Sequence, residues 1–416
     1  MFVGKGGVGK TTLACATALG YARAGRRVLI ASLDQAHSLG DALGFVFPHD
    51  PGTVAGIARV APGVDVIEID SLALLEDRFA DVRSLLAKGG NHNHGIDLAS
   101  LDPAELTGLP GVQELLMLIE IAAYVDEAEW DVVIVDCPPS ADMVRLITAP
   151  ETLLNYLERL WPRHARAMSA VGTDLRKAVL AASVERIVSS VTRVRDLLAD
   201  RARTSARLVT GPEQVAVTEA RRVRSAAALL GLRLAAVVVN KVLPAVPPPG
   251  DSAHPAVHWY LNRRAEQLEV VARLHEQLDD VPIIVAAHAG AEPVGVGSLT
   301  AFSYAVDTPM PPNTQAADSG VAMVRWESGS GVDSVYAMRM RMPAVDPGTL
   351  RLGRVEDDLI VGVDGVRRRV ALAPVLRRCT VSGAELDDGH LVVRFRPDPH
   401  VWPADPNYPK ASAHEQ

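Results

Sequence analysis

The chain has 416 residues, a net charge of −8 and a hydrophobic content of 48%. This length is enough for two or three domains with a large buried core. The acidic balance argues against unaided binding to DNA or RNA, so we expect no nucleic-acid partner. The most apolar stretch, residues 115–124, contains Glu120 and is too short to cross a bilayer, so no membrane-spanning segment is expected.

The three cysteines, Cys15, Cys137 and Cys379, are widely spaced, odd in number and form no Cys-x-x-Cys pair. This usage suits the reducing cytoplasm and argues against a structural zinc site. A phosphate-binding motif begins almost at the first residue and leaves no room for a secretory signal. We therefore expect a cytoplasmic protein.

That motif is a glycine-rich loop with the pattern Gly-x-x-x-x-Gly-Lys-Thr. Its glycines let backbone N–H groups cradle phosphates, and the helix that follows points its positive end at them. Lys10 is expected to reach the β- and γ-phosphates, and the Thr11 hydroxyl to hold Mg²⁺. A flexible turn is the alternative, but strong helix formers follow the loop. We expect the nucleotide, ATP, to contact the run Gly4, Lys5, Gly6, Gly7, Val8, Gly9, Lys10, Thr11 and Thr12.

Lys5 stands where an ordinary phosphate loop has no fixed requirement, and it cannot easily serve the nucleotide of its own loop. A lysine at this point resembles the signature lysine of the deviant-P-loop (SIMIBI) ATPases, which crosses to the nucleotide of a partner subunit. The resemblance implies a homodimer. Only residues 1–3 precede the loop, whereas a strand normally has about five or six residues. We expect the natural start to lie upstream, rather than the first strand to be clipped.

Short β-rich runs alternate with helices from residue 1 to about 302, which predicts an α/β fold, a P-loop NTPase with a mostly parallel sheet covered by helices. The expected strands are 27–33, 64–69, 131–136, 206–210, 234–240 and 281–286, with long helices at 213–230 and 256–278. Proline, glycine and serine indicate a linker at 303–331. Alternating strands at 336–342, 359–363 and 391–396 then predict a small antiparallel β-sandwich at 332–403, followed by a tail at 404–416.

Two of these strands lead into an acidic residue, at the edge of the sheet where ligands collect in α/β folds. Strand 131–136 ends in Asp136 and matches the Walker-B pattern, in which the carboxylate helps to hold Mg²⁺. Asp34 follows strand 27–33 and could hold or polarise an attacking water molecule. An N-cap for the next helix is the alternative for Asp34.

Several motifs in the right order resemble the arsenite-pump ATPase (ArsA) family, which includes the guided-entry ATPases that carry tail-anchored membrane proteins. The motifs are the loop at 5–12, Asp34-Gln-Ala-His-Ser-Leu-Gly-Asp-Ala-Leu43, Asp136 with Pro139-Ser140 and Arg145-Leu146, Pro212-Glu213, and 237–240. The resemblance covers residues 1–302. It implies that Asp34 activates water, assisted by Lys5 and Lys10, and that Glu213 and Asn240 contact the nucleotide. An amide such as Asn240 suits an adenine edge, although it could also be a turn residue that closes the strand.

The chain departs from the family pattern in three places. Gln35 replaces the usual proline, and residues 136–142 look closer to the ParA/MinD ATPases. Near His258 the chain lacks the cysteine pair that binds zinc in eukaryotic dimers, so no zinc is expected.

Residues 336–395 resemble the α-crystallin (small heat-shock protein-like) domain of some family members.

Residues 161–204 carry an apolar stripe at helical spacing, formed by Leu180, Val184, Ile187, Val188, Val191, Val194 and Leu198. In guided-entry ATPases, helices of this region form a groove for a client's transmembrane helix; ordinary core packing is the alternative. We expect a Mg²⁺-dependent, dimeric ATPase that opens and closes to bind and release hydrophobic, tail-anchored-type clients. Two other functions stay open: the energising subunit of an arsenite or anion transporter, and a ParA/MinD-like positioning ATPase.

Overall fold

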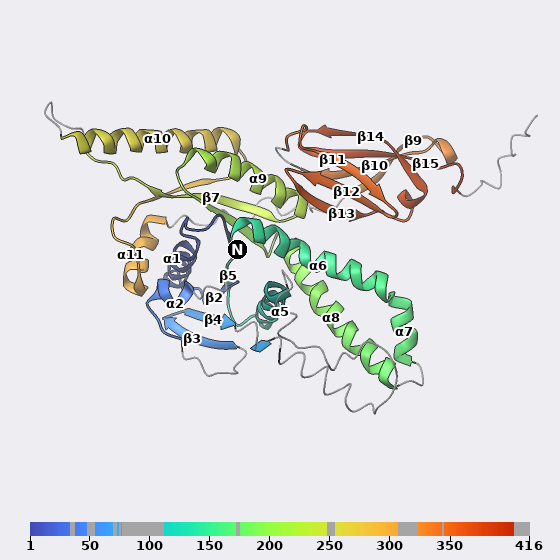
Figure 1. Ribbon diagram of the computed structural model, residues 1–416, viewed down its shortest axis with the longest axis horizontal. Coiled ribbons are helices and arrows are strands. Elements are labelled where there is room, and N and C mark those ends of the chain that lie inside the picture. Colours follow the sequence, from blue (N-terminus) through green and yellow to red (C-terminus); the bar gives the residue numbers. More distant parts are fainter. Residues whose placement is uncertain are drawn as a thin grey trace, which may run out of the picture. The chain divides into compact units, whose positions relative to one another are not determined.

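The computed structural model describes residues 1–33, 38–47, 55–69, 73–74, 76, 112–171, 175–247, 254–306, 323–342 and 345–402 (Figure 1). The chain divides into two compact units. One unit comprises Met1–Val223 and Leu232–Thr314, and the other comprises Arg224–Gly231 and Gln315–Gln416. Asp34, Gln35 and the expected tail at 404–416 lie outside the described residues.

The first unit contains an eight-stranded sheet with the order β3-β4-β2-β5-β1-β6-β7-β8. Neighbouring strands are parallel except β3 and β4, which are antiparallel. Strands β2 and β5 consist largely of valine, isoleucine and leucine and are mostly buried, as expected for strands covered on both faces. The strands are β1 (Phe2–Val3), β2 (Val28–Ser32), β3 (Ala55–Ala61), β4 (Val64–Ile69), β5 (Val132–Asp136), β6 (Ser205–Thr210), β7 (Arg233–Val242) and β8 (Ile283–Ala287).

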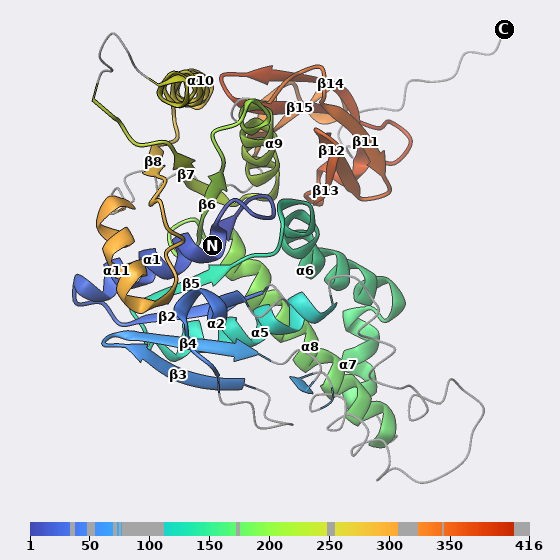
Figure 2. The same cartoon turned by 60° about the vertical axis from the view of Figure 1, so that its left-hand side comes forward.

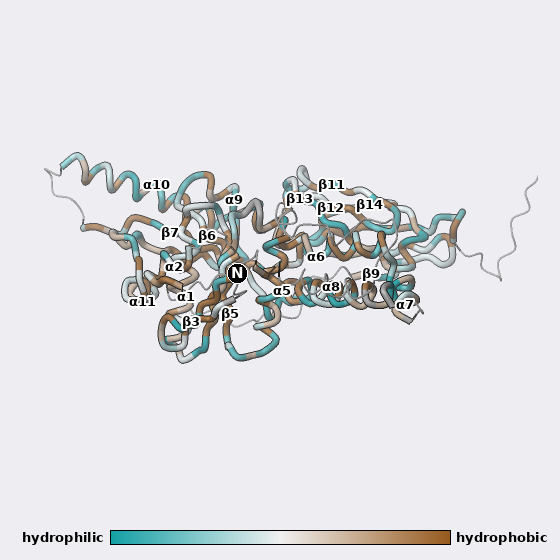
Figure 3. Tube along the Cα trace, turned by 60° about the horizontal axis from the view of Figure 1, so that its bottom comes forward, coloured by the Kyte–Doolittle hydropathy of each residue, from teal (hydrophilic) through white to brown (hydrophobic). Residues whose placement is uncertain are grey.

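Helices pack around this sheet. Helix α1 lies beside α11, and α5 lies beside α8 (Figure 2). Helices α1, α2 and α11 share one core with the sheet, which includes Leu13, Ile30, Val66 and Leu299. Hydrophilic and hydrophobic residues alternate along α10 (Figure 3). The helices are α1 (Lys10–Arg23), α2 (Ser38–Leu43), α5 (Val112–Glu127), α6 (Ser140–Leu160), α7 (Arg163–Val171), α8 (Leu175–Ala199), α9 (Gln214–Leu230), α10 (Pro255–Gln277) and α11 (Gly295–Val306).

Strand β1 contributes only two residues between neighbours of five and six residues. Phe2 pairs with Asp136 of β5 and with Arg207 of β6. The amino group of Met1 donates a hydrogen bond of 2.9 Å to the carbonyl oxygen of Ser205, and its burial lowers its pKa. A cavity of about 640 Å³ beside Met1 is lined by residues of β5, β6, α1, α5 and α8. Because β1 lies between β5 and β6 in the sheet, the phosphate loop that follows β1 begins at the centre of the sheet.

The second unit contains two antiparallel sheets, with the orders β14-β15-β10-β9 and β11-β12-β13. Alternate residues of β10, β12 and β15 form a shared core that includes Met338, Met340, Leu359, Val361 and Phe395. Two-residue turns with positive φ, 364–365 and 388–389, join β12 to β13 and β14 to β15. The strands are β9 (Met323–Ser328), β10 (Val335–Arg341), β11 (Arg351–Val355), β12 (Asp358–Val363), β13 (Val366–Ala371), β14 (Cys379–Asp387) and β15 (His390–Pro397).

This architecture confirms the predicted fold class, a mostly parallel α/β sheet followed by a small antiparallel part. Both ends of the expected linker at 303–331 contain regular secondary structure. Helix α11 continues to Val306, and residues 323–328 form β9, which pairs with β10. Ser328, Gly329 and Ser330 suggest a linker by composition, but pairing with β10 gives residues 323–328, which include Ser328, their strand conformation.

Candidate nucleotide site

The phosphate loop connects β1 to α1, and glycines occupy its two closest approaches to neighbouring strands. Gly4 has φ +149° and Gly9, the N-cap of α1, has φ +92°, values that residues with a Cβ rarely adopt. A Cβ at Gly4 would collide with the carbonyl oxygen of Val209 in β6. A Cβ at Gly9 would collide with Nδ2 of Asn240 in β7. The N-terminal N–H groups of α1, which have no partner inside the helix, are thus held at the sheet edge.

A cavity of about 550 Å³ opens beside the loop, at the carboxyl edge of the parallel strands. Its size is that of a small-molecule site. Because the loop and the N-terminus of α1 form one wall, the cavity is suited to the phosphates of a nucleotide. Its lining consists of Gly6, Gly7, Gly9, Lys10, Thr11, Thr12, Ser38, Pro139, Asn240, Lys241, residues 287–293 and Phe302.

Three oxygen-bearing side chains from different elements meet at the base of the loop. The Thr11 hydroxyl in α1 donates a hydrogen bond of 2.6 Å to Oδ2 of Asp136, the last residue of β5. The same hydroxyl lies 3.3 Å from the hydroxyl of Ser38 in α2. Asp136 is completely buried. Carboxylate and hydroxyl oxygens are hard ligands of the type that Mg²⁺ prefers.

The two lysines of the loop have different partners. Lys10 is buried, and its ammonium donates a hydrogen bond of 3.1 Å to the backbone carbonyl of Lys5 across the loop. The side chain of Lys5 is 53% exposed, and its Nζ lies 3.4 Å from Oε2 of Glu219 in α9. The ammonium of Lys10 therefore contacts the backbone of its own loop, whereas the ammonium of Lys5 forms an ion pair with helix α9.

Asn240 is buried near the end of β7 and holds the loop. Its Nδ2 donates a hydrogen bond of 2.9 Å to the carbonyl oxygen of Val8, and its Oδ1 accepts one of 2.9 Å from the backbone N–H of Lys241. A primary amide has two N–H donors and two acceptor lone pairs, so Asn240 retains capacity for a ligand in the cavity that it lines.

Of the expected site residues that the structure describes, five do not line this cavity, namely Gly4, Lys5, Val8, Asp136 and Glu213. Asp34 lies outside the described residues. Glu213 precedes α9, and its carboxylate lies against Gly211 rather than in the lining of the cavity. The structure adds Ser38 and Lys241, which the sequence does not single out. Lys241 directly follows Asn240, and that adjacency is the one signal that could have indicated it.

Cys15 and Cys137 are both buried near the loop. Burial raises the pKa of the Cys15 thiol and raises that of Cys137 to about 12. Both therefore stay protonated at neutral pH, whereas the thiolate is the form that binds metals and metalloids. In the part of the chain that the structure describes, no group of three or more His, Cys, Asp or Glu residues could hold a metal ion. No described helix combines the length and the apolar character needed to cross a membrane.

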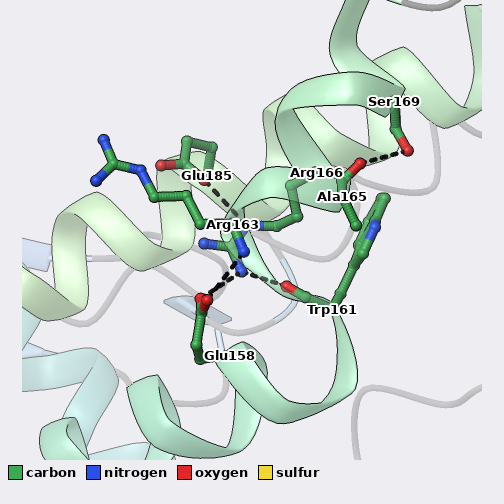
Figure 4. Close-up of polar contacts among 7 residues, drawn as sticks. All are labelled: Glu158, Trp161, Arg163, Ala165, Arg166, Ser169 and Glu185. Atoms are coloured by element: carbon green, nitrogen blue, oxygen red, sulfur yellow. Dashed lines mark hydrogen bonds and ion pairs between the residues drawn. The ribbon is translucent and has the colours of Figure 1, made fainter. Parts of the chain in front are cut away.

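Helices α6, α7 and α8, which we term the arm, extend from the sheet at Ser140 (Figure 1). Arg166 of α7 is buried where the three helices meet. Its guanidinium forms ion pairs with Glu158 of α6 at 3.4 Å and with Glu185 of α8 at 3.1 Å (Figure 4). It also donates a hydrogen bond to the carbonyl oxygen of Trp161. One buried cation thereby ties all three helices together.

The apolar stripe of α8 has two distinct parts. Val191, Val194 and Leu198 are buried, so core packing explains that end of the stripe. Nearer the start of α8, Ile187 is 44% exposed, and Leu180, Val184 and Val188 are half-buried. The other two helices of the arm add large exposed apolar side chains, namely Tyr156 and Leu160 of α6 and Met168 of α7. We term the end of α6, helix α7 and the start of α8 the outer arm. The outer arm therefore carries four large apolar side chains that are exposed, namely Tyr156, Leu160, Met168 and Ile187.

Comparison with known proteins places both units. The profile of the ArsA family, described as anion-transporting ATPase, matches residues 1–307, and that of the HSP20-like domain found in ArsA matches residues 333–395. The chain is 44% identical to protein Rv2184c of Mycobacterium tuberculosis over 420 residues, 97% of each chain. It is 33% identical to protein SCO2128 of Streptomyces coelicolor, covering 97% of this chain and 98% of that protein. It is 27% identical to the ATPase ASNA1 homolog of Entamoeba histolytica, covering 72% of this chain and 90% of that protein. The chain therefore belongs to the ArsA family of P-loop ATP hydrolases and carries the HSP20-like domain of that family at its carboxyl end.

Proposed function

We propose that the protein is a homodimeric, Mg²⁺-dependent ATPase of the cytoplasm whose cycle binds and releases hydrophobic clients such as tail-anchored membrane proteins. One observation carries this proposal: a direct path leads from the nucleotide cavity to the arm. Asp136 ends β5, Pro139 lines the cavity, and α6 begins at Ser140. The 21 residues of α6 then lead to the exposed Tyr156 and Leu160, about 24 Å and about 30 Å from Ser140 at the usual rise of a helix.

In the proposed reaction, a water molecule attacks the γ-phosphorus of ATP in line with the β–γ bridge. The new oxygen–phosphorus bond forms as the bridging bond breaks, which yields ADP and inorganic phosphate. Lys10 and the N–H groups of the loop offset the negative charge of the phosphates and hold them in place. Asp34 is proposed to orient the water molecule, and Asn240 and Glu213 to hold the nucleoside.

The residues beside the loop fit Mg²⁺. The hydroxyl of Thr11 and the carboxylate of Asp136 would hold the ion, and the Ser38 hydroxyl is a third oxygen nearby. When bound, Mg²⁺ supplies positive charge that neutralises the phosphates. Because Thr11 and Asp136 are already hydrogen-bonded to each other, neither side chain has to be brought from a distance.

The homodimer is proposed on the position of Lys5. The ammonium of Lys5 is 53% exposed, although the carboxylate of Glu219 is only 10% exposed, so solvent screens the ion pair from one side and the pair contributes about 1 kcal/mol. Lys5 can therefore exchange Glu219 for the phosphates of a nucleotide bound to a second copy of the chain. We propose that this exchange accompanies the closed, ATP-bound state.

The client is proposed on the apolar surface of the outer arm. Tyr156, Leu160, Met168 and Ile187 are each more than 40% exposed, and large apolar side chains exposed on neighbouring helices are candidates for an interaction site. A transmembrane helix of about 20 apolar residues would cover such a surface. The relationship to an ATPase ASNA1 homolog supports this direction, and the described part of the arm supplies the exposed Tyr156, Leu160 and Met168.

The proposal is tested by retention of a labelled transmembrane-helix peptide in each nucleotide state. The double variant Leu160→Ser/Met168→Ser should lose most of the peptide while hydrolysing ATP. Its matched control, Trp259→Ser/Leu268→Ser, changes two exposed apolar residues of α10 and should retain the peptide. Equal retention by both double variants would exclude the outer arm as the client surface.

A second function, energising an anion transporter, is favoured by the description of the matching family. The cysteines argue against arsenite as the transported anion, because Cys15 and Cys137 are buried and their raised pKa values keep them as thiols. Stimulation of ATP hydrolysis by arsenite, without any retention of the peptide, would support the transporter over the client carrier.

A further inference from the structure

Lys241 has an unusual backbone conformation for a lysine. It lies near the end of β7 with φ +62°, in the left-handed region that glycine and asparagine tolerate best. The register of β7 with β8 shifts between Val239 and Val242, so Lys241 lies in an irregular part of the ladder. Non-glycine residues held in this region are energetically costly and cluster at functional sites. Glycine would fit the backbone more easily, which directs attention to the side chain of Lys241.

The side chain of Lys241 reaches the phosphate loop. Its Nζ donates a hydrogen bond of 2.8 Å to the carbonyl oxygen of Gly7, while the neighbouring Asn240 donates to the carbonyl oxygen of Val8. Two consecutive carbonyls of the loop are therefore held by two consecutive side chains of β7. The chain has only six lysines, and Lys5, Lys10 and Lys241 are all at this loop.

Peptide planarity gives these two contacts a consequence for phosphate binding. In a trans peptide the carbonyl and the N–H of the next residue point in opposite directions. When the Gly7 carbonyl points to Lys241, the N–H of Val8 must point away from Lys241. When the Val8 carbonyl points to Asn240, the N–H of Gly9 must point away from Asn240. These N–H groups belong to the run that cradles phosphates in loops of this type.

We propose that Lys241 is a positioning residue that fixes the phosphate loop in its binding conformation before the nucleotide arrives. The ammonium acts through the Gly7 carbonyl and the attached Val8 N–H, rather than on the γ-phosphate. ATP and ADP should therefore depend on it equally, because both present α- and β-phosphates to the loop. The inference concerns nucleotide binding by a single chain, so it does not depend on the proposed dimer or client.

The test compares the dissociation constants of ATP and ADP, measured by isothermal titration, for the wild type and three variants of the full chain. Lys241→Met keeps the length of the side chain but removes the donor, and should weaken both nucleotides by about tenfold, or 1.4 kcal/mol. Lys241→Arg keeps a charged donor and should recover part of the affinity. Lys177→Met changes an exposed lysine of α8 and serves as the control.

Lys241→Gly separates positioning from folding. Glycine relieves the left-handed backbone, so this variant should melt no lower than the wild type while still binding both nucleotides more weakly. In steady-state hydrolysis, the larger change for Lys241→Met should be in KM rather than in kcat. Unchanged affinity for both nucleotides in Lys241→Met would overturn the proposal. Weakened binding of ATP with unchanged binding of ADP would also overturn it, because that result indicates direct contact with the γ-phosphate.

Discussion

The hydroxyl of Thr11 lies 2.6 Å from a carboxylate oxygen of Asp136, although the two residues are 125 positions apart in the chain. This hydrogen bond joins the first turn of α1 to the end of β5. Because α6 begins at Ser140, the same short segment connects the base of the phosphate loop to the arm. A change at the phosphates therefore has a direct covalent route to the exposed apolar surface.

Asp136→Asn should abolish most ATP hydrolysis. The substitution keeps the shape of the side chain and removes its negative charge, so kcat should fall by about a hundredfold or more if the carboxylate supports Mg²⁺. Phosphate release at saturating ATP and Mg²⁺ measures this directly. Cys137→Ala, a change at the adjacent buried position, is the control and should keep turnover. A fully active Asp136→Asn enzyme would show that the carboxylate is not part of the metal site.

Glu219→Gln should favour the ATP-bound dimer. The substitution removes the negative charge that attracts the Lys5 ammonium within one chain. The ion pair that is lost contributes about 1 kcal/mol or less to the stability of the single chain. The dimerisation constant in ATP should rise by up to about fivefold, as measured by analytical ultracentrifugation. Lys5→Ala should have the opposite effect and leave mostly monomer. If neither variant changes the dimer in ATP, Lys5 does not act across the interface.

Arg166→Met should loosen the arm without affecting nucleotide binding. The variant loses a buried guanidinium and its two ion pairs. Glu158 and Glu185 are half-exposed, so water can solvate their carboxylates when Arg166 is removed. We therefore expect the free energy of unfolding of the arm to fall by about 1–3 kcal/mol. Hydrogen exchange of α7 should become faster, while that of α1 should not change. Arg163→Met, at an exposed neighbouring arginine, should leave α7 protected. Normal protection of α7 in Arg166→Met would show that the three-helix junction is held by apolar contacts instead.

The native protein should react very slowly with iodoacetamide. Burial raises the pKa of Cys137 to about 12 and raises those of Cys15 and Cys379 as well, so the reactive thiolate is scarce at pH 7 to 8. Mass spectrometry should find no rapid labelling in native buffer and three labelled cysteines in guanidinium. Each unit of pH should raise the native rate about tenfold below these pKa values. Rapid labelling of any cysteine in the native protein would show that a reactive thiolate is available, and would again favour a metalloid-binding site.

The sequence reveals much of this fold because its strands are unusually explicit. Residues 132–135 are Val-Val-Ile-Val and residues 237–239 are three consecutive valines, and such continuous apolar runs are typical of buried parallel strands. Strand β3 (Ala55–Ala61) is different: it contains alanine, glycine and arginine, and its pairing with β4 defines it. Such a strand depends on a distant partner, so local composition does not indicate it.

The candidate site is predictable where a motif fixes both residue type and position. Thr11 and Asp136 meet because a loop and a strand end are tied to one edge of the sheet. Lys241 is not predictable in this way, because its role depends on a left-handed backbone and on a carbonyl 234 positions away. The pairing of Lys5 with Glu219 is likewise a long-range contact that no local pattern encodes.

The most direct test of the central claim combines hydrolysis and peptide capture in one experiment. Purified wild type and Asp34→Asn are incubated with ATP, Mg²⁺ and a labelled transmembrane-helix peptide, and the released phosphate and the retained peptide are measured together. We predict that the wild type hydrolyses ATP and releases the peptide. Asp34→Asn should lose hydrolysis and retain the peptide as an ATP-bound dimer. Hydrolysis by the wild type, with no peptide retained by either protein in any nucleotide state, would contradict the proposal that this ATPase carries hydrophobic clients.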